Sequence, residues 1–231
     1  MRRVEGSRIV LWALALSMTF VLVSCAGTKC CSTGSGEYSR KQADDGWVEI
    51  FNGKDLTGWE VMGRPKESFY AEDGVLVCAG KGAGWIRYTE ELDNFVLRLE
   101  YKVTKRANSG VFLRSAEKGH PAYTGFEIQI LDDHGLTPNT HVSGAVYDVV
   151  KPTENTSKPM GEWNQFEITC DGPKVIVVHN GTKVIDINLD EFTEPMGKFK
   201  TPYAKLPRKG YIGLQDHGYP LWFRNISVKK L

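Results

Sequence analysis

A carboxylate and a carboxamide occupy alternate positions in the segment GFEIQILDD, residues 125–133. The phenylalanine and the two isoleucines between them would face the other side of a β-strand, because successive side chains of a strand point to opposite faces. Glu127 and Gln129 would then share the polar face. A carboxylate can act there as a general base, and a carboxamide can hold a ligand by hydrogen bonds. We expect these two side chains to line a groove that binds a sugar.

Other segments present polar side chains in the same way. In NSGVFLR the alternation points Phe112 and Arg114 away from the core, and in LQDHG it places Gln215 and His217 on one face. In SGAVYD the side chain of Tyr147 is in phase with an alanine. If the strands that carry these segments lie side by side, the five residues join the same groove.

Several of these residues also have a purely structural interpretation. Arg114 can form an ion pair with Glu127, although a partly buried pair of that kind contributes little net stability. The loop histidines His134 and His141 can simply be solvated. Asp132 stands where a strand ends, so turn formation explains it, and metal binding by Asp132 with His134 is an alternative.

Strand patterns cover most of the chain after residue 45. FVLRLEYKV alternates apolar and charged residues, and KVIVVHNGTKVIDI, residues 174–187, predicts a β-hairpin that turns at Asn180-Gly181. No helical periodicity extends beyond about one turn. Many short strands with frequent turn residues in one domain predict an all-β fold, a jelly-roll β-sandwich of two antiparallel sheets.

The N-terminus has the pattern of an export signal. Three arginines precede the apolar run IVLWALALSMTFVLV, and LVSC, which ends at Cys25, resembles the lipobox of bacterial lipoproteins. We therefore predict a signal peptide over residues 1–24, an acylated Cys25, a flexible tether over 25–45 and a folded domain over 46–231. Acyl chains would anchor the protein in the lipid bilayer of a bacterial cell envelope.

Charge and cysteine content exclude some other classes. The formal net charge of +1 favours no binding of nucleic acid. Cys78 and Cys170 lie in apolar strand patterns, where buried thiols are expected rather than a disulfide, and no Cys/His spacing is typical of a structural zinc site.

The chain also resembles a known family. The segments that carry the resemblance appear in order over residues 46–231: IFNGKDLTGWE, DGVLVCAGKGAGWI, LRLEYKVTKRANSGVFLR, GFEIQILDD, SGAVYD, GEWNQFEITCDGPKVIVVHNG and GYIGLQDHG. Together they are similar to the 3-keto-disaccharide hydrolase family. The resemblance implies a concanavalin A-like jelly roll and the cleavage of glycosides whose sugar carries a ketone at C3.

A ketone at C3 changes the catalytic requirement. It acidifies the C2 hydrogen, so a base can form an enolate, the C1 substituent leaves, and water adds to C1. Such a site needs one base, a group that stabilises the enolate oxygen and a proton donor for the leaving oxygen. The candidates for catalysis are Glu127, His217, Arg114 and Tyr147, and those for substrate binding are Gln129, Gln215, Asn108, Phe112 and His141. A divalent metal is a further candidate for stabilising the enolate.

Two other functions use the same groove. A laminarinase-like glycosidase needs two carboxyl groups about 5 to 5.5 Å apart, usually from an E-x-D-x-E strand. Here that face reads Glu127, Gln129, Leu131, so the second carboxylate would have to come from a loop residue such as Asp132 or Asp148. A non-catalytic carbohydrate-binding module needs only the aromatic and amide side chains.

The predicted anchor can be tested at Cys25. Replacing Cys25 by Ser removes the sulfur that would be acylated, so we expect the variant to take up no lipid label and to leave the membrane fraction. Metabolic labelling with a fatty acid, followed by fractionation, measures both. Labelling equal to that of the wild type would show that Cys25 is not the acylated residue.

Overall fold

The computed structural model describes residues 45–82 and 84–231. The predicted signal peptide 1–24, Cys25 and the tether up to residue 44 lie outside the described residues. Within the described part, no helix is long and apolar enough to cross a membrane.

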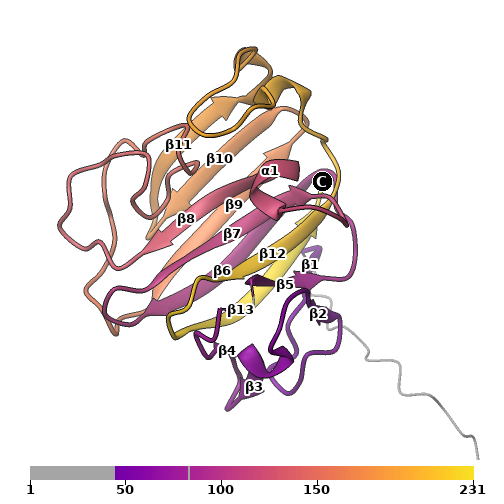
Figure 1. The fold of residues 1–231 in the computed structure, drawn as a ribbon, viewed down its shortest axis with the longest axis vertical. Helices are drawn as coiled ribbons and strands as arrows, with labels where there is room; N and C mark the ends of the chain where they lie inside the picture. Colours follow the sequence, from indigo (N-terminus) through magenta and orange to yellow (C-terminus); the bar gives the residue numbers. More distant parts are fainter. Residues whose placement is uncertain (1–44, 83) are drawn as a thin grey trace, which may run out of the picture. The chain divides into compact units, whose positions relative to one another are not determined.

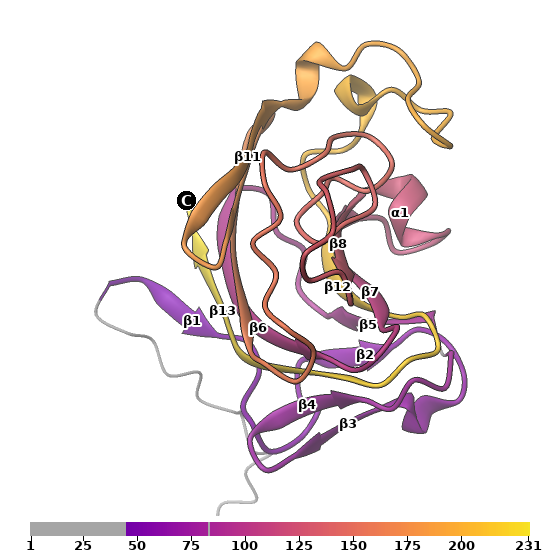
Figure 2. The ribbon, with the colours of Figure 1, turned by 90° about the vertical axis from the view of Figure 1, so that its left-hand side faces the viewer.

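Two antiparallel sheets form the domain, one layer on the other (Figures 1 and 2). The larger sheet has the order β11 (Thr182–Asn188), β10 (Lys174–His179), β9 (Asn164–Asp171), β6 (Phe95–Val103), β13 (Leu221–Lys230), β4 (Val75–Cys78) and β3 (Phe69–Glu72), with β1 (Trp47–Glu49) also paired to β13. The smaller sheet has the order β2 (Trp59–Val61), β5 (Gly84–Tyr88), β12 (Tyr211–Asp216), β7 (Asn108–Ser115) and β8 (Phe126–Leu131). The predicted jelly-roll sandwich is confirmed.

The strands follow the expected alternation. Along β6 every second side chain is buried between the sheets and the others are partly exposed. The predicted hairpin is β10 and β11, and its turn residues Asn180 and Gly181 both have positive φ, as a tight two-residue turn requires. Cys78 and Cys170 are buried free thiols, as predicted.

Short helices lie in the connections. The one α-helix among the described residues, α1 (Pro121–Thr124), lies on the outer side of the smaller sheet, against β7 and β8 (Figure 2). The 3-10 helices comprise Lys66–Ser68, Leu189–Glu191 and Tyr203–Lys205.

A loop closes the free edge of β8. Backbone hydrogen bonds of 2.9–3.0 Å join Gly144 and Ala145 to Gln129, and Tyr147 to Glu127. The loop that contains SGAVYD therefore extends the sheet beyond β8 and brings Tyr147 beside Glu127. It also covers an edge that would otherwise present unpaired backbone groups.

The expected position of Arg114 is wrong. Residues 112 and 115 of β7 pair with 213 and 211 of β12, so β7 carries one extra residue, and Arg114 has a φ of 53°. This β-bulge reverses the alternation and turns the Arg114 side chain away from the outer face. The guanidinium is fully buried and donates to the Asp93 carbonyl at 2.6 and 2.9 Å and to the Gly172 carbonyl at 2.6 Å. Arg114 therefore joins β7 to loops of the larger sheet and does not reach Glu127.

Arg114→Met tests this structural role. The methionine fills similar space but leaves the Asp93 and Gly172 carbonyls without their donors, so we expect a loss of roughly 2–4 kcal/mol in the free energy of unfolding. Urea unfolding measures it. Arg98→Met is the control, since Arg98 lies in a partly exposed pair with Glu167 and should cost less than about 1 kcal/mol. Equal losses in both variants would contradict the assigned role.

Candidate active site

One pocket on the outer face of the smaller sheet collects most of the predicted site residues. It has a volume of about 110 Å³, and we call it the Glu127 pocket. Six of its lining residues were predicted from sequence and two were not: Asn108, Glu127, Gln129, Tyr147, Gln215 and His217, with His120 and Lys198 in addition. Strands β8, β7 and β12 and four connecting segments therefore converge on one site.

Glu127 is the buried carboxylate of this pocket. The residue is only 3% exposed, and no hydrogen bond or ion pair to its carboxylate occurs among the described residues. Burial raises the pKa of Glu127 to about 8, and the positive charge of Lys198 opposes part of that rise. A carboxyl group that titrates near neutral pH is suited to take a proton from a substrate.

A glycine creates the space for this carboxylate. Gly110 pairs with Gln129 on the neighbouring strand, and a Cβ atom at Gly110 would lie 2.7 Å from the Cγ and Cδ atoms of Glu127. The backbone of Gly110 lies outside the left-handed region, so its torsion angles do not require a glycine. The missing side chain instead lets Glu127 lie flat across β7.

The two amides of the pocket orient each other. Gln129 Nε2 donates to Asn108 Oδ1 at 3.0 Å and to the Ile130 carbonyl at 3.3 Å. The amide nitrogen of Asn108 and the amide oxygen of Gln129 are thereby directed to other partners. The pair can offer one donor and one acceptor to the hydroxyl groups of a sugar.

Lys198 comes from the loop between β11 and β12. Its ammonium group lies 4.2 Å from the centre of the Tyr147 ring, and its backbone N–H donates to Asp148 Oδ2 at 2.7 Å. His141 Nε2 pairs with Asp148 Oδ1 at 3.1 Å. His141 thus supports the loop and lines none of the described pockets, so its predicted contact with substrate is not supported.

His120 was missed by the sequence analysis. It is the N-cap of α1, where its Nδ1 accepts a hydrogen bond from the Ala122 N–H at 3.3 Å. Burial, followed by the charge of Lys198, lowers the pKa of His120, which favours the neutral ring. With Nδ1 as the acceptor, the proton of the neutral ring is on Nε2, which can donate into the pocket.

Two larger pockets share lining residues with the Glu127 pocket. The Trp85 pocket, of about 310 Å³, shares His120, Gln215 and His217 with it and is also lined by Trp85 and Phe112. The Trp85 ring lies across Gly213 and meets the Phe112 ring edge-on at 5.8 Å. The predicted binding residue Phe112 therefore contributes to this neighbouring pocket.

The second neighbour is the Tyr123 pocket, of about 320 Å³. It shares Lys198 with the Glu127 pocket and is lined by Ala122, Tyr123, Gly125, Lys198, Phe199, Lys200, Thr201, Tyr203 and Leu206. The three pockets are linked by shared lining residues, and we call them together the groove.

The residues named for a metal do not form a metal site. Asp132 Oδ2 accepts from the Arg106 N–H at 2.8 Å, and His134 Nδ1 lies 2.6 Å from the Ser157 carbonyl. Neither residue lines the Glu127 pocket. Among the described residues, no group of three or more His, Cys, Asp or Glu side chains is placed to hold a metal ion.

The space at Gly110 gives a test of how Glu127 is held. Gly110→Ala should push the carboxylate out of its buried position, so we expect the pKa of Glu127 to fall towards its usual range and the protein to lose stability. Carboxyl titration by NMR and urea unfolding measure the two effects. In a Glu127→Ala background the same substitution meets no carboxylate, and it should then cost little. An equal cost in both backgrounds would show that Glu127 is not the group that Gly110 accommodates.

Comparison with known proteins agrees with the resemblance seen in the motifs. The family model described as a 3-keto-alpha-glucoside-1,2-lyase-like domain matches residues 46–229. A 3-keto-disaccharide hydrolase of Bacteroides thetaiotaomicron is 28% identical, over 91% of this chain and 94% of that protein.

Crystal structures extend the match. One candidate glycosyl hydrolase from Parabacteroides distasonis is 32% identical, covers 80% of this chain and 99% of its own, and superposes with a TM-score of 0.72. A second from the same organism is 26% identical, covers 81% and 94%, and has a TM-score of 0.69. Since the family model spans nearly the whole described domain, the chain belongs to the 3-keto-disaccharide hydrolase family.

Proposed function

We propose that this protein cleaves the glycosidic bond of 3-keto-glycosides, with Glu127 as the base that removes the C2 proton. Membership of the family and the name of the Bacteroides relative support the substrate class. The observation that carries the mechanism is a single buried carboxylate, with its pKa raised to about 8, in a pocket lined by hydrogen-bonding groups.

The proposed reaction has two steps, elimination of the C1 substituent and addition of water. The Glu127 carboxylate takes the C2 proton, and the electrons of that bond form an enolate on the C3 oxygen. The enolate then expels the C1 substituent, which leaves with the electron pair of the C1–O bond and gains a proton. Water adds to C1 of the unsaturated ketone, C2 regains a proton, and the products are a 3-keto sugar and the free leaving group.

The neighbouring groups fit the other two requirements. Among the described residues, Lys198 is the only lysine or arginine that lines the Glu127 pocket, so its charge can stabilise the enolate oxygen, a role that the sequence analysis gave to Arg114. His120 can donate its Nε2 proton to the leaving oxygen. His217 and Tyr147 line the same pocket and are the alternative donors.

The arrangement disfavours a laminarinase-like mechanism. In the described part of the chain, Glu127 is the only residue with a carboxylate that lines this pocket. Asp148 is bonded to the Lys198 N–H and to His141, and Asp216 in the adjoining pocket accepts from Ser68 and from the Gly218 N–H. A second free carboxylate at the spacing for double displacement is therefore missing from the described site.

A carbohydrate-binding module is the remaining alternative. Binding alone would be served by the amides and aromatic rings, and it needs no carboxyl group with a raised pKa. An ionisable group without a partner is costly to bury. Its presence in the centre of the groove favours catalysis.

We also propose that the enzyme acts at the bacterial cell envelope, anchored through an acylated Cys25. The LVSC segment supports this location.

The pH dependence of activity tests Glu127 as the base. Because burial raises the pKa of Glu127 to about 8, the base form is scarce at pH 6, and kcat/KM for a 3-keto-glucoside should rise with pH and level off above about 8. Glu127→Gln should lower turnover by roughly 10²- to 10⁴-fold, and its kcat/KM should no longer rise with pH in this range.

The raised pKa of Glu127 also affects stability, because the folded state keeps the proton on this carboxyl group at pH values where the unfolded state has lost it. The free energy of unfolding should therefore fall between about pH 4.5 and 8 in the wild type and less in Glu127→Gln.

Isotope exchange separates the three functions. Cleavage in heavy water should place deuterium at C2 of the product, and ordinary glucosides should remain intact. Cleavage of ordinary glucosides without exchange would establish a conventional glycosidase, and binding without turnover would establish a binding module. Activity of Glu127→Gln within a few-fold of the wild type would assign the role of base to another residue, and His217 would be the next candidate.

A further inference from the structure

The Tyr123 pocket lies beside the base but is not needed to remove a proton. It shares one lining residue, Lys198, with the Glu127 pocket. Burial, followed by the negative charge of Glu127, raises the pKa of Tyr203, a second residue of the Tyr123 pocket, so Glu127 is near enough to act on this side chain. A substrate held with C2 at Glu127 can therefore extend its C1 substituent into this pocket.

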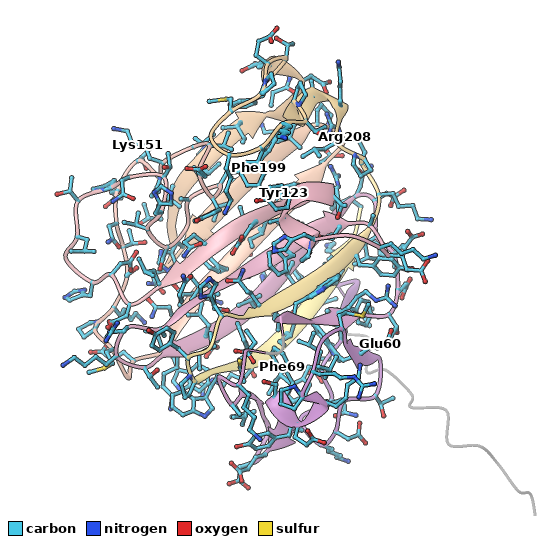
Figure 3. The ribbon with its side chains drawn as sticks, viewed as in Figure 1. Glu60, Phe69, Tyr123, Lys151, Phe199 and Arg208 are labelled. Atoms are coloured by element: carbon cyan, nitrogen blue, oxygen red, sulfur yellow. The ribbon has the colours of Figure 1, made fainter. Side chains whose placement is uncertain are left out.

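Aromatic side chains form one wall of the pocket. Tyr123 is 47% exposed, and its ring meets the Phe199 ring edge-on at 5.4 Å; Figure 3 shows the two rings close together. The Tyr123 ring also contacts the His120 ring, with 5.0 Å between the ring centres, and His120 lines the Glu127 pocket. An exposed ring held in place by two others offers a flat surface on which a planar group can stack.

The charged groups of the pocket are hydrogen-bond donors. Of the described residues that line it, only Lys198 and Lys200 are charged, and none carries a carboxylate. Lys200 forms no ion pair or hydrogen bond with any other described residue. The Tyr203 hydroxyl is buried without a hydrogen-bond partner among the described residues, and burial raises its pKa, so it remains a donor.

These features distinguish between the possible leaving groups. The hydroxyl groups of a second sugar both donate and accept, so they pair best with carboxylate and amide side chains, and the described lining of the pocket contains none of these. A phenolic ring presents a flat apolar face and an oxygen that accepts hydrogen bonds and carries negative charge as it leaves. Ammonium groups stabilise that charge, and they can also lie over the ring face.

We infer that the Tyr123 pocket is the leaving-group subsite and that it accepts aromatic aglycones, so that the substrates include 3-keto-glucosides of phenols. The inference rests on the proposed function for the position of the sugar. In the elimination step the C1–O bond breaks towards the phenolic oxygen, which departs as phenoxide and takes a proton from solvent or from His120. The lysines of the pocket lower the energy of that phenoxide.

Substrate comparison with full-length protein tests the subsite. Tyr123→Ala should lower kcat/KM for phenyl 3-keto-glucoside roughly fivefold to tenfold, the effect of one lost aromatic contact, and should change kcat/KM for methyl 3-keto-glucoside less than twofold. Lys200→Met should lower the phenyl value roughly threefold with the same selectivity. Tyr70→Ala and Lys54→Met are matched controls, since Tyr70 is similarly exposed, at 41%, on β3 of the other sheet, and neither residue lines the groove.

Each other outcome overturns the inference. Equal losses for both substrates in Tyr123→Ala would make Tyr123 a structural residue. A loss confined to a 3-keto-disaccharide, with the phenyl substrate unaffected, would assign the pocket to a second sugar.

A binding assay keeps this test separate from the proposed reaction. If the wild type cleaves no 3-keto-glucoside, the proposed function fails, and calorimetric binding of phenyl 3-keto-glucoside then decides about the pocket alone. Binding weakened roughly fivefold or more by Tyr123→Ala supports the subsite. Equal binding by the wild type and the variant overturns it.

Discussion

The site depends on a carboxylate that is buried without a counter-ion in contact. An ionised carboxyl group loses hydration when it is buried, so Glu127 favours its protonated form up to about pH 8. Neighbouring segments bury this carboxyl group without placing a positive charge in direct contact with it. The 144–147 segment closes the edge of β8, while Lys198 lies near enough to moderate the pKa without forming an ion pair. A direct salt bridge would lower the pKa and remove the base strength that proton abstraction requires.

Two glycines without side chains shape the outer face of the smaller sheet. Gly110 gives Glu127 its position across β7, and Gly213 does the same for Trp85 across β12. Both glycines lie in central strands of the smaller sheet, where a glycine normally weakens pairing and packing. The inner face of the smaller sheet nevertheless packs into the apolar core. The smaller sheet can therefore offer a hollow outer face while its inner face remains fully packed.

Sequence alternation predicted the parts of the site that lie on regular strands. Glu127, Gln129 and Gln215 follow a period of two and were placed correctly on the outer face, and the hairpin at Asn180 followed from its turn chemistry. The side-chain orientation predicted for Arg114 was wrong because one extra residue in β7 reverses the two-residue alternation of the strand. No residue in NSGVFLR indicates a β-bulge. His120 and Lys198 lie in loops, where no periodicity relates position in the chain to position in space. Their convergence on Glu127 depends on contacts between distant segments.

The loop that carries Lys198 links catalysis to substrate choice. Its backbone is tied to Asp148, its lysine lies over Tyr147 beside the base, and its next residue, Phe199, lies in the wall of the Tyr123 pocket. A change in this loop would alter the pKa of Glu127 and the shape of the leaving-group subsite together. The strands fix the base, whereas one loop adjusts both its electrostatic environment and the neighbouring pocket. Among members of this family, we therefore expect differences in leaving group to be accompanied by differences in pH dependence.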